Sequence, residues 1–138
     1  MNVTGACHCG SIEFSADVDA SQVLVCHCTD CQILAGSAFR VNARAPFESF
    51  KVTKGQPKIY VKIAESGAER LHGFCPECGT PLYSVAPVNP SVIFLRIGAI
   101  HQRDSLRPAV QIWRRSTVSW LHELDSVPGS PEQQALTL

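Results

Sequence analysis

Seven cysteines limit most strongly what this chain can fold into. They occur in short clusters at Cys7 and Cys9, at Cys26, Cys28 and Cys31, and at Cys75 and Cys78. An odd number leaves one thiol over in any set of disulfides, and a reducing cytosol keeps thiols reduced. Metal binding tolerates that environment, so the cysteines predict metal sites, and disulfides are the weaker alternative.

The pair Cys75 and Cys78 has the spacing of a zinc knuckle. Two cysteines separated by two residues reach one ion through a tight turn, and zinc prefers four tetrahedral ligands. Pro76 fixes one backbone angle of the turn, and Gly79 is placed to open it. This pair supplies two ligands and needs two more from elsewhere in the chain.

Two pairings can complete that site. In the first, Cys7 and Cys9 join the knuckle, and the cluster of three cysteines forms a second site. In the other, two members of that cluster join the knuckle, and Cys7 and Cys9 have no site. We prefer the first because it uses all seven thiols. It also matches the division between closed structural zinc sites and catalytic sites with three protein ligands and an open position. Spacing alone leaves the other pairing open.

Histidine is the alternative source of a fourth ligand. His8 and His27 each lie between two cysteines, so wholly structural zinc with a histidine ligand is a second reading of the clusters. In an extended segment, however, neighbouring side chains point to opposite sides. If the flanking cysteines face a metal, each histidine faces away, and we expect neither to be a ligand. For the isolated His72, His101 and His122, core, surface and substrate roles are all open, and we expect a structural one.

The rest of the pattern predicts a mostly β domain. Short segments of strand character are separated by Gly, Pro, Asn and Asp, and alternation is clear at residues 39–43 and 58–63. The predicted strands are 11–16, 22–26, 38–43, 48–53, 58–63, 71–74, 82–85 and 91–97. A short helix is expected at 29–34, ending near Gly36. We expect one domain over residues 1–125 with at most one or two short helices, and a polar C-terminal tail over 126–138.

Charge and hydropathy argue against two kinds of partner. The 138 residues include 12 basic and 12 acidic side chains, so the chain has no electrostatic footprint for nucleic acid or an anionic membrane surface. No segment approaches the length of a transmembrane helix. Residues 1–7 lack the basic and apolar regions of a signal peptide, so we expect a cytoplasmic protein.

Together, four motifs resemble one known family. They are Gly-Ala-Cys-His-Cys-Gly at residues 5–10, Cys-His-Cys-Thr-Asp-Cys at 26–31, Gly-Phe-Cys-Pro-Glu-Cys-Gly-Thr-Pro-Leu at 73–82, and Pro-Ala-Val-Gln-Ile-Trp at 108–113. Their order and spacing are similar to those of the glutathione-dependent formaldehyde-activating enzyme family, which includes centromere protein V. The resemblance runs from Gly5 to about Leu124.

The resemblance implies a fold and a set of ligands. The fold is mostly β, with several coiled, partly open antiparallel sheets around zinc, called a β-tent. Two Zn²⁺ ions per chain are implied. The first is structural and would be held by Cys7, Cys9, Cys75 and Cys78. The second would be held at the open, catalytic site by Cys26, Cys28 and Cys31.

The resemblance also implies an activity. The family's namesake reaction joins formaldehyde and glutathione to give S-hydroxymethylglutathione, and it is classed as a carbon–sulfur lyase. The implied function is therefore the addition of a zinc-bound small thiol, such as glutathione, to a small aldehyde. The alternative is a non-catalytic module with purely structural zinc that acts through a protein partner.

Gln111 departs from the family pattern, because members often have histidine there. If that histidine serves a substrate, the namesake reaction is in doubt, whereas a packing role leaves it intact.

Arginines are the candidates for holding glutathione, which carries two carboxylates. Arg40 and Asn42 follow the cluster of three cysteines, and Arg114 and Arg115 lie beside Trp113. We expect the tryptophans Trp113 and Trp120 themselves to lie in the core.

Overall fold

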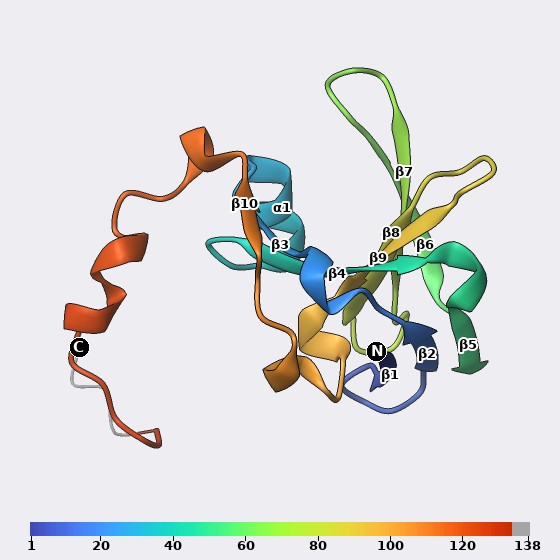
Figure 1. Cartoon of the computed structure of the whole chain (residues 1–138), viewed down its shortest axis with the longest axis horizontal. Helices are drawn as coiled ribbons and strands as arrows, with labels where there is room; N and C mark the ends of the chain where they lie inside the picture. Colours follow the sequence, from blue (N-terminus) through green and yellow to red (C-terminus); the bar gives the residue numbers. More distant parts are fainter. Residues whose placement is uncertain (134–138) are drawn as a thin grey trace.

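The computed structural model describes residues 1–133 and contains two β-sheets (Figure 1). The smaller sheet is antiparallel, in the order β1-β2-β5, with β1 (Asn2–Ala6), β2 (Glu13–Asp17) and β5 (Lys51–Lys54). The larger sheet has the order β10-β3-β4-β9-β8-β7-β6. Its strands are β3 (Val23–Cys26), β4 (Arg40–Pro46), β6 (Lys58–Ile63), β7 (Glu69–Phe74), β8 (Pro81–Val85), β9 (Val92–Arg96) and β10 (Val110–Ile112).

Helical structure is sparse in the described part of the chain. Its one α-helix is α1 (Thr29–Ala35), which ends at Gly36 in a left-handed conformation, as the sequence predicts. The other turns are short 3-10 helices: η1 (Ala20–Gln22), η2 (Phe47–Ser49), η3 (Ile97–Ala99), η4 (Arg103–Ser105), η5 (Arg114–Ser116) and η6 (Leu121–Ser126). The prediction of a mostly β fold with at most one or two short helices is confirmed.

The core lies between the two sheets. Val3 and Phe14 from the smaller sheet are buried in one cluster with Ala43, Leu82 and Leu95 from the larger sheet. β1 and β2 turn alternate residues inward, as in the burial of Phe14 and Ala16 but not of their neighbours in β2. Burial of this apolar surface is the main force that holds the two sheets together.

Two strands differ from the sequence prediction. β1 and β10 are short, contain polar residues or glycine and were not predicted. β10 also pairs with β3 in parallel, whereas every other strand pair in residues 1–133 is antiparallel, as expected. The predicted strand at 48–53 begins only at Lys51, because Phe47–Ser49 form a 3-10 turn.

The C-terminal segment leads away from the sheets (Figure 1). Trp113 and Trp120 are 48% and 50% exposed, so the expectation that they lie in the core is wrong. Trp113 has a φ of +57° directly after β10, which turns the chain away from the sheet, and the Arg115 guanidinium lies 4.9 Å from the centre of its ring. Of the predicted tail, residues 127–133 are exposed, and 134–138 lie outside the described residues. The domain boundary at 125 stays a prediction.

Within residues 1–133 no helix combines the length and the apolar character that a membrane crossing requires.

Candidate metal centres

Four cysteines from two distant turns meet at one point. Cys7, Cys9, Cys75 and Cys78 have their sulfur atoms within 4.8 Å of one another. The first two lie in the turn between β1 and β2, and the other two lie in the turn between β7 and β8. Each sheet therefore contributes one hairpin turn, and the cluster ties the two sheets together.

The two turns differ in length by one residue but share two backbone features, a hydrogen bond that closes the turn and a left-handed glycine. The Gly10 N–H donates to the Cys7 carbonyl at 3.1 Å, and the Gly79 N–H donates to the Cys75 carbonyl at 2.9 Å. Both glycines have a φ of +74°, a left-handed conformation that a residue with a side chain adopts only with strain. These turns bring both sulfurs of each pair to one side, as a shared metal ion requires.

Thr80 joins the two turns and contacts a sulfur. Its Oγ1 accepts a hydrogen bond from the His8 N–H at 3.0 Å and lies 3.1 Å from the Cys78 sulfur. Hydrogen bonds from Thr80, first from its side chain and then from its backbone, lower the pKa of Cys78 to about 5. This thiol is therefore readily converted to the thiolate that ligates metal.

The distances within this group fit zinc. The sulfurs of Cys7 and Cys9 are 3.6 Å apart, and those of Cys9 and Cys75 are 3.8 Å apart. Zn–S bonds near 2.3 Å in a tetrahedron place neighbouring sulfurs about 3.8 Å apart. Cys7 and Cys75 are buried while Cys9 and Cys78 are exposed, so an ion held here would lie at the edge of the core.

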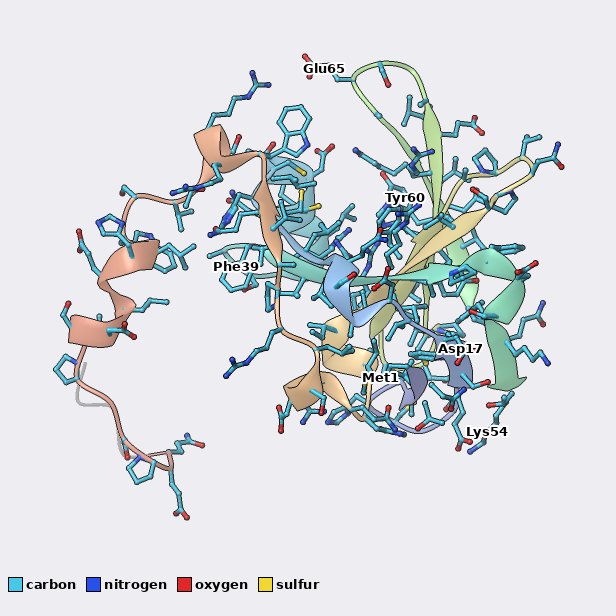
Figure 2. The ribbon with its side chains drawn as sticks, in the orientation of Figure 1. Met1, Asp17, Phe39, Lys54, Tyr60 and Glu65 are labelled. Carbon is cyan, nitrogen blue, oxygen red and sulfur yellow. The ribbon has the colours of Figure 1, made fainter. Side chains whose placement is uncertain are left out.

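The other three cysteines form a second group at the start of α1. Cys26 ends β3, Cys28 caps the helix and Cys31 lies in its first turn, and the three sulfurs are within 4.8 Å of one another. The Cys31 N–H donates to the Cys28 sulfur at 3.3 Å, so the same contact that caps the helix also places one sulfur. In Figure 2, yellow sulfur atoms are visible beside α1.

A cation is needed before all three thiols can lose their protons. Burial raises the pKa of Cys31 to about 12, and the opposing attraction of Arg40 does not offset it. Burial also raises the pKa of Cys26. Three thiolates packed this closely repel one another unless a metal ion neutralises them. The seven sulfur atoms thus fall into one group of four and one of three, which is the grouping preferred from the sequence.

A cavity of about 230 Å³ opens beside the group of three cysteines, and Cys26 and Cys31 line it. Arg40 and Asn42, the residues proposed from the sequence as substrate contacts, line the same cavity. Further lining side chains are His72, Arg96, Lys62, Arg70 and Asp30, none of which was singled out from the sequence as a substrate contact. The sequence contains one indication that Arg96 is functional, because this charged residue ends the otherwise apolar segment Val92–Arg96.

The polar side chains of this cavity contact one another. Arg96 donates to the Asn42 side-chain oxygen and, at 3.2 Å, to Nδ1 of His72. Burial, followed by the charges of Arg96 and Arg40, lowers the pKa of His72 to about 4, so its imidazole is neutral at pH 7. Lys62 pairs with Asp30 at 2.7 Å. The His72 side chain thus lines the same cavity as Cys26 and Cys31, and which of the roles left open by the sequence it has stays a prediction.

The histidines between the cysteines have other partners. The backbone of His8 contacts Thr80, and its side chain is not part of the four-sulfur group. His27 is buried, and its Nε2 lies 2.8 Å from Oε1 of Gln111. Neither histidine belongs to a group of converging donors. Alternation accounts for His27, which directly follows β3, whereas His8 lies in a turn.

Gln111 lies on the opposite face of the sheet from the three cysteines. It pairs with Val25 in the parallel register, while Ile112 pairs with Cys26. Gln111, Val25 and His27 line a cavity of about 620 Å³, whereas Cys26 and Ile112 line the smaller cavity. Arg114 lines the larger cavity and Arg115 contacts Trp113, so neither is among the residues that line the cavity beside the cysteines.

Comparisons with known proteins agree with the motifs. A family model described as glutathione-dependent formaldehyde-activating enzyme matches residues 2–116. A protein from Colletotrichum graminicola, named "Putative glutathione-dependent formaldehyde-activating enzyme", is 34% identical over 79 residues, which are 56% of this chain. The matched part spans only 40% of that relative's length. A crystal structure of a Rhodobacter sphaeroides protein is similar in fold, with a TM-score of 0.60, 19% identity and coverage of 78% of this chain and 98% of that one.

Proposed function

This chain belongs to the glutathione-dependent formaldehyde-activating enzyme family, and on that basis we propose that it adds a small thiol such as glutathione to a small aldehyde. The observation that carries the proposal is the group of Cys26, Cys28 and Cys31 beside a cavity lined by cations. Among the described residues no fourth His, Cys, Asp or Glu converges on these sulfurs, which suits a position left for a ligand.

Two zinc ions are part of the proposal. Cys7, Cys9, Cys75 and Cys78 would hold a structural ion, and Cys26, Cys28 and Cys31 would hold the second. Three thiolates leave zinc with a net charge near −1, so it supplies a place that holds and deprotonates a thiol better than one that generates hydroxide. A cytoplasmic location suits both sites, because cysteines stay reduced there.

The proposed reaction forms a carbon–sulfur bond and an oxygen–hydrogen bond, while the S–H bond of the thiol and the π bond of the carbonyl group break. The thiol loses its proton, its sulfur bonds to the aldehyde carbon, and the carbonyl oxygen takes a proton to become a hydroxyl group. No oxidant or reductant is consumed, and the reverse reaction breaks the same carbon–sulfur bond, which is why such an activity is a carbon–sulfur lyase.

The chain's own residues would position the reactants. Cys28 is fixed by the start of α1 and Cys26 by the end of β3, so the three sulfurs are held by regular structure rather than by a free loop. Arg40 and Arg96 place positive charge beside the sulfurs, which favours thiolate over thiol. Phe94 and Leu34 add apolar surface to the cavity wall.

The test is the variant Cys28→Ser, assayed with glutathione and formaldehyde alongside a zinc determination. We expect two zinc ions per wild-type chain, one per variant chain, and loss of turnover in a variant that remains folded. His8→Ala is the control, because His8 also lies beside cysteines but is exposed and outside both sulfur groups. Unchanged turnover of Cys28→Ser would reject the mechanism. A single zinc ion per wild-type chain would favour the non-catalytic module instead.

A further inference from the structure

Two arginines beside the three cysteines are buried without a partner of opposite charge. Arg40 is 5% exposed and Arg96 is 6% exposed. In the described part of the chain, the ion pairs are Lys54–Glu13, Lys62–Asp30 and His122–Glu123, and neither arginine takes part in one. Nε of each guanidinium is also buried without a hydrogen-bond partner there. Buried charges are normally paired, and no carboxylate of residues 1–133 pairs with either arginine, so both can accept an anion from outside this part of the chain.

Sheet register brings the two arginines together. Asn42 on β4 pairs directly with Arg96 on β9, and Arg40 lies two residues before Asn42 on the same face of β4. Asn42 and His72 accept hydrogen bonds from the two Nη atoms of Arg96 and hold its guanidinium in place. Both arginines line the cavity of the three cysteines as well as two adjoining cavities. Arg96 is therefore held by its neighbours, and Arg40 is a buried side chain and not a mobile surface one.

The charges around the cavity do not balance. Four cations line it, namely Arg40, Lys62, Arg70 and Arg96, against the single carboxylate of Asp30. That carboxylate is already paired with Lys62. A metal ion held by three thiolates would add a net charge of only about −1. The cavity therefore keeps an excess of positive charge and favours an anion.

We propose that Arg40 and Arg96 form a binding subsite for a carboxylate group beside the cysteine group of three. A guanidinium presents parallel N–H donors that match the two oxygens of a carboxylate, and such bonds are stronger between charged partners than between neutral ones. A cavity of about 230 Å³ accommodates a small carboxylic acid or one end of a larger ligand. The subsite limits substrates to those with a negative charge close to the reacting atoms.

The carboxylate can come from either of two reactants, and this choice rests on the proposed function. It can belong to the thiol, as in glutathione, or to the electrophile, as in a 2-oxo acid such as glyoxylate. Binding of the carboxylate itself does not depend on turnover, so the subsite and the proposed function can fail separately.

Calorimetric titration of the zinc-loaded protein tests the subsite, with acetate compared against acetamide at constant ionic strength. Acetamide has nearly the same shape but no charge. We expect acetate to bind at least about tenfold more tightly than acetamide, and this preference to disappear in Arg96→Met and Arg40→Met. Arg96→Lys, which keeps the charge but loses the forked geometry, is expected to bind acetate more weakly than wild type. Arg44→Met is the matched control, because Arg44 lies on the same strand but is exposed and outside this cavity.

Thermal unfolding of each variant shows whether it is folded before it is titrated, and Arg96→Lys keeps the test available if a methionine variant does not fold. Equal affinity of wild type for acetate and acetamide would overturn the proposal, as would an unchanged preference in a folded Arg96→Met variant.

Competition then identifies the source of the carboxylate. Displacement of acetate by glutathione but not by glyoxylate would assign the subsite to the thiol, and the opposite result would assign it to the electrophile. Displacement by neither would overturn its role in substrate binding. Acetate binding without turnover of glutathione and formaldehyde would reject the proposed function and leave the subsite standing.

Discussion

The backbone N–H of His8 donates to Oγ1 of Thr80 at 3.0 Å across 72 positions of sequence. Because His8 lies in the β1–β2 turn and Thr80 follows the β7–β8 turn, this bond joins the two halves of the four-cysteine group. The same oxygen lies 3.1 Å from the Cys78 sulfur. One hydroxyl group thus helps to set the distance between the turns and stabilises a thiolate.

The Thr80 hydroxyl is expected to contribute to stability. Thr80→Val keeps the shape but removes both hydrogen bonds, and we expect it to lower the free energy of unfolding by about 1–3 kcal/mol. Thr80→Ser keeps the hydroxyl and is the control. Urea unfolding of both zinc-loaded variants provides the measurement. A valine variant as stable as the serine variant would show that the bond between the turns contributes nothing.

We expect glycine to be required at position 79 because of its left-handed backbone conformation, and not because a side chain there would collide with neighbouring atoms. Its φ is +74°, and a Cβ added there would meet nothing within 4 Å. Gly79→Ala should therefore lower the free energy of unfolding by about 1–2 kcal/mol through backbone strain alone. Gly98→Ala is a matched control, since Gly98 also has open space around it but no positive φ. Equal thermal stability of the two variants would contradict this account.

The sequence predicted those elements whose residue pattern and pairing partner lie within a short stretch of the chain. Residues 58–63 form β6 with the predicted bounds, and the helix after Cys28 ends at Gly36 as expected. The alternation in β6 also predicts a half-buried strand, which is wrong, because five of its six residues are exposed. β1 and β10 were missed because each is short and gains its stability from a partner strand rather than from its own pattern. The parallel pairing of β10 with β3 depends on a connection of more than eighty residues, which local sequence does not encode.

The candidate site was predictable only in part, for the same reason. Spacing and the number of thiols indicated the grouping of the cysteines, because metal chemistry restricts both. Arg40 was considered because it follows the cysteines in sequence. Arg96 and His72 lie 56 and 32 positions beyond Arg40 and reach the cavity through the register of β9 and β7. Register depends on the whole sheet, so no short motif marks them.

The bond between Gln111 and His27 predicts a supporting role for the position at which family members often have histidine. Gln111→Ala would leave both ring nitrogens of the buried His27 without a partner, since Nδ1 already has none among the described residues. We expect a loss of about 1–3 kcal/mol in the free energy of unfolding. Gln111→His can restore a donor or acceptor and is expected to stay close to wild type in stability and in the affinity for glutathione.

Isothermal titration and urea unfolding check both Gln111 variants. A change in glutathione affinity of more than about tenfold in a stable Gln111→His variant would show that this position contacts the substrate, although it lies on the other face of the sheet from Cys26.

Metal removal is expected to affect the two sulfur groups differently. The group of four joins two sheets, so Cys75→Ser should abolish cooperative unfolding, in line with the roughly 10–16 kcal/mol that a structural zinc ion supplies to small domains. The group of three lies at one strand–helix junction, and Cys31→Ser should leave the chain folded. Circular dichroism at increasing chelator concentration separates the two cases. Equal loss of structure in both variants would contradict the division into a structural and an open site.

His72 predicts a specific dependence of stability on pH. Its pKa in the folded protein is lowered to about 4, mainly by burial and then by Arg96, from an ordinary value of 6.5. The unfolded chain therefore binds a proton more readily than the folded one between pH 6.5 and about 4. Above pH 6.5 the imidazole is neutral in both states and does not affect stability, whereas holding it neutral lowers the free energy of unfolding increasingly as the pH falls from 6.5 to about 4. Glutamine in His72→Gln cannot titrate. The stability of wild type relative to this variant should therefore fall as the pH falls from 6.5 to about 4, and it should stay constant from pH 7 to 8. His101→Gln is the control, because His101 is exposed. A difference between wild type and His72→Gln that does not change between pH 7 and pH 4.5 would mean that His72 is not held neutral beside Arg96.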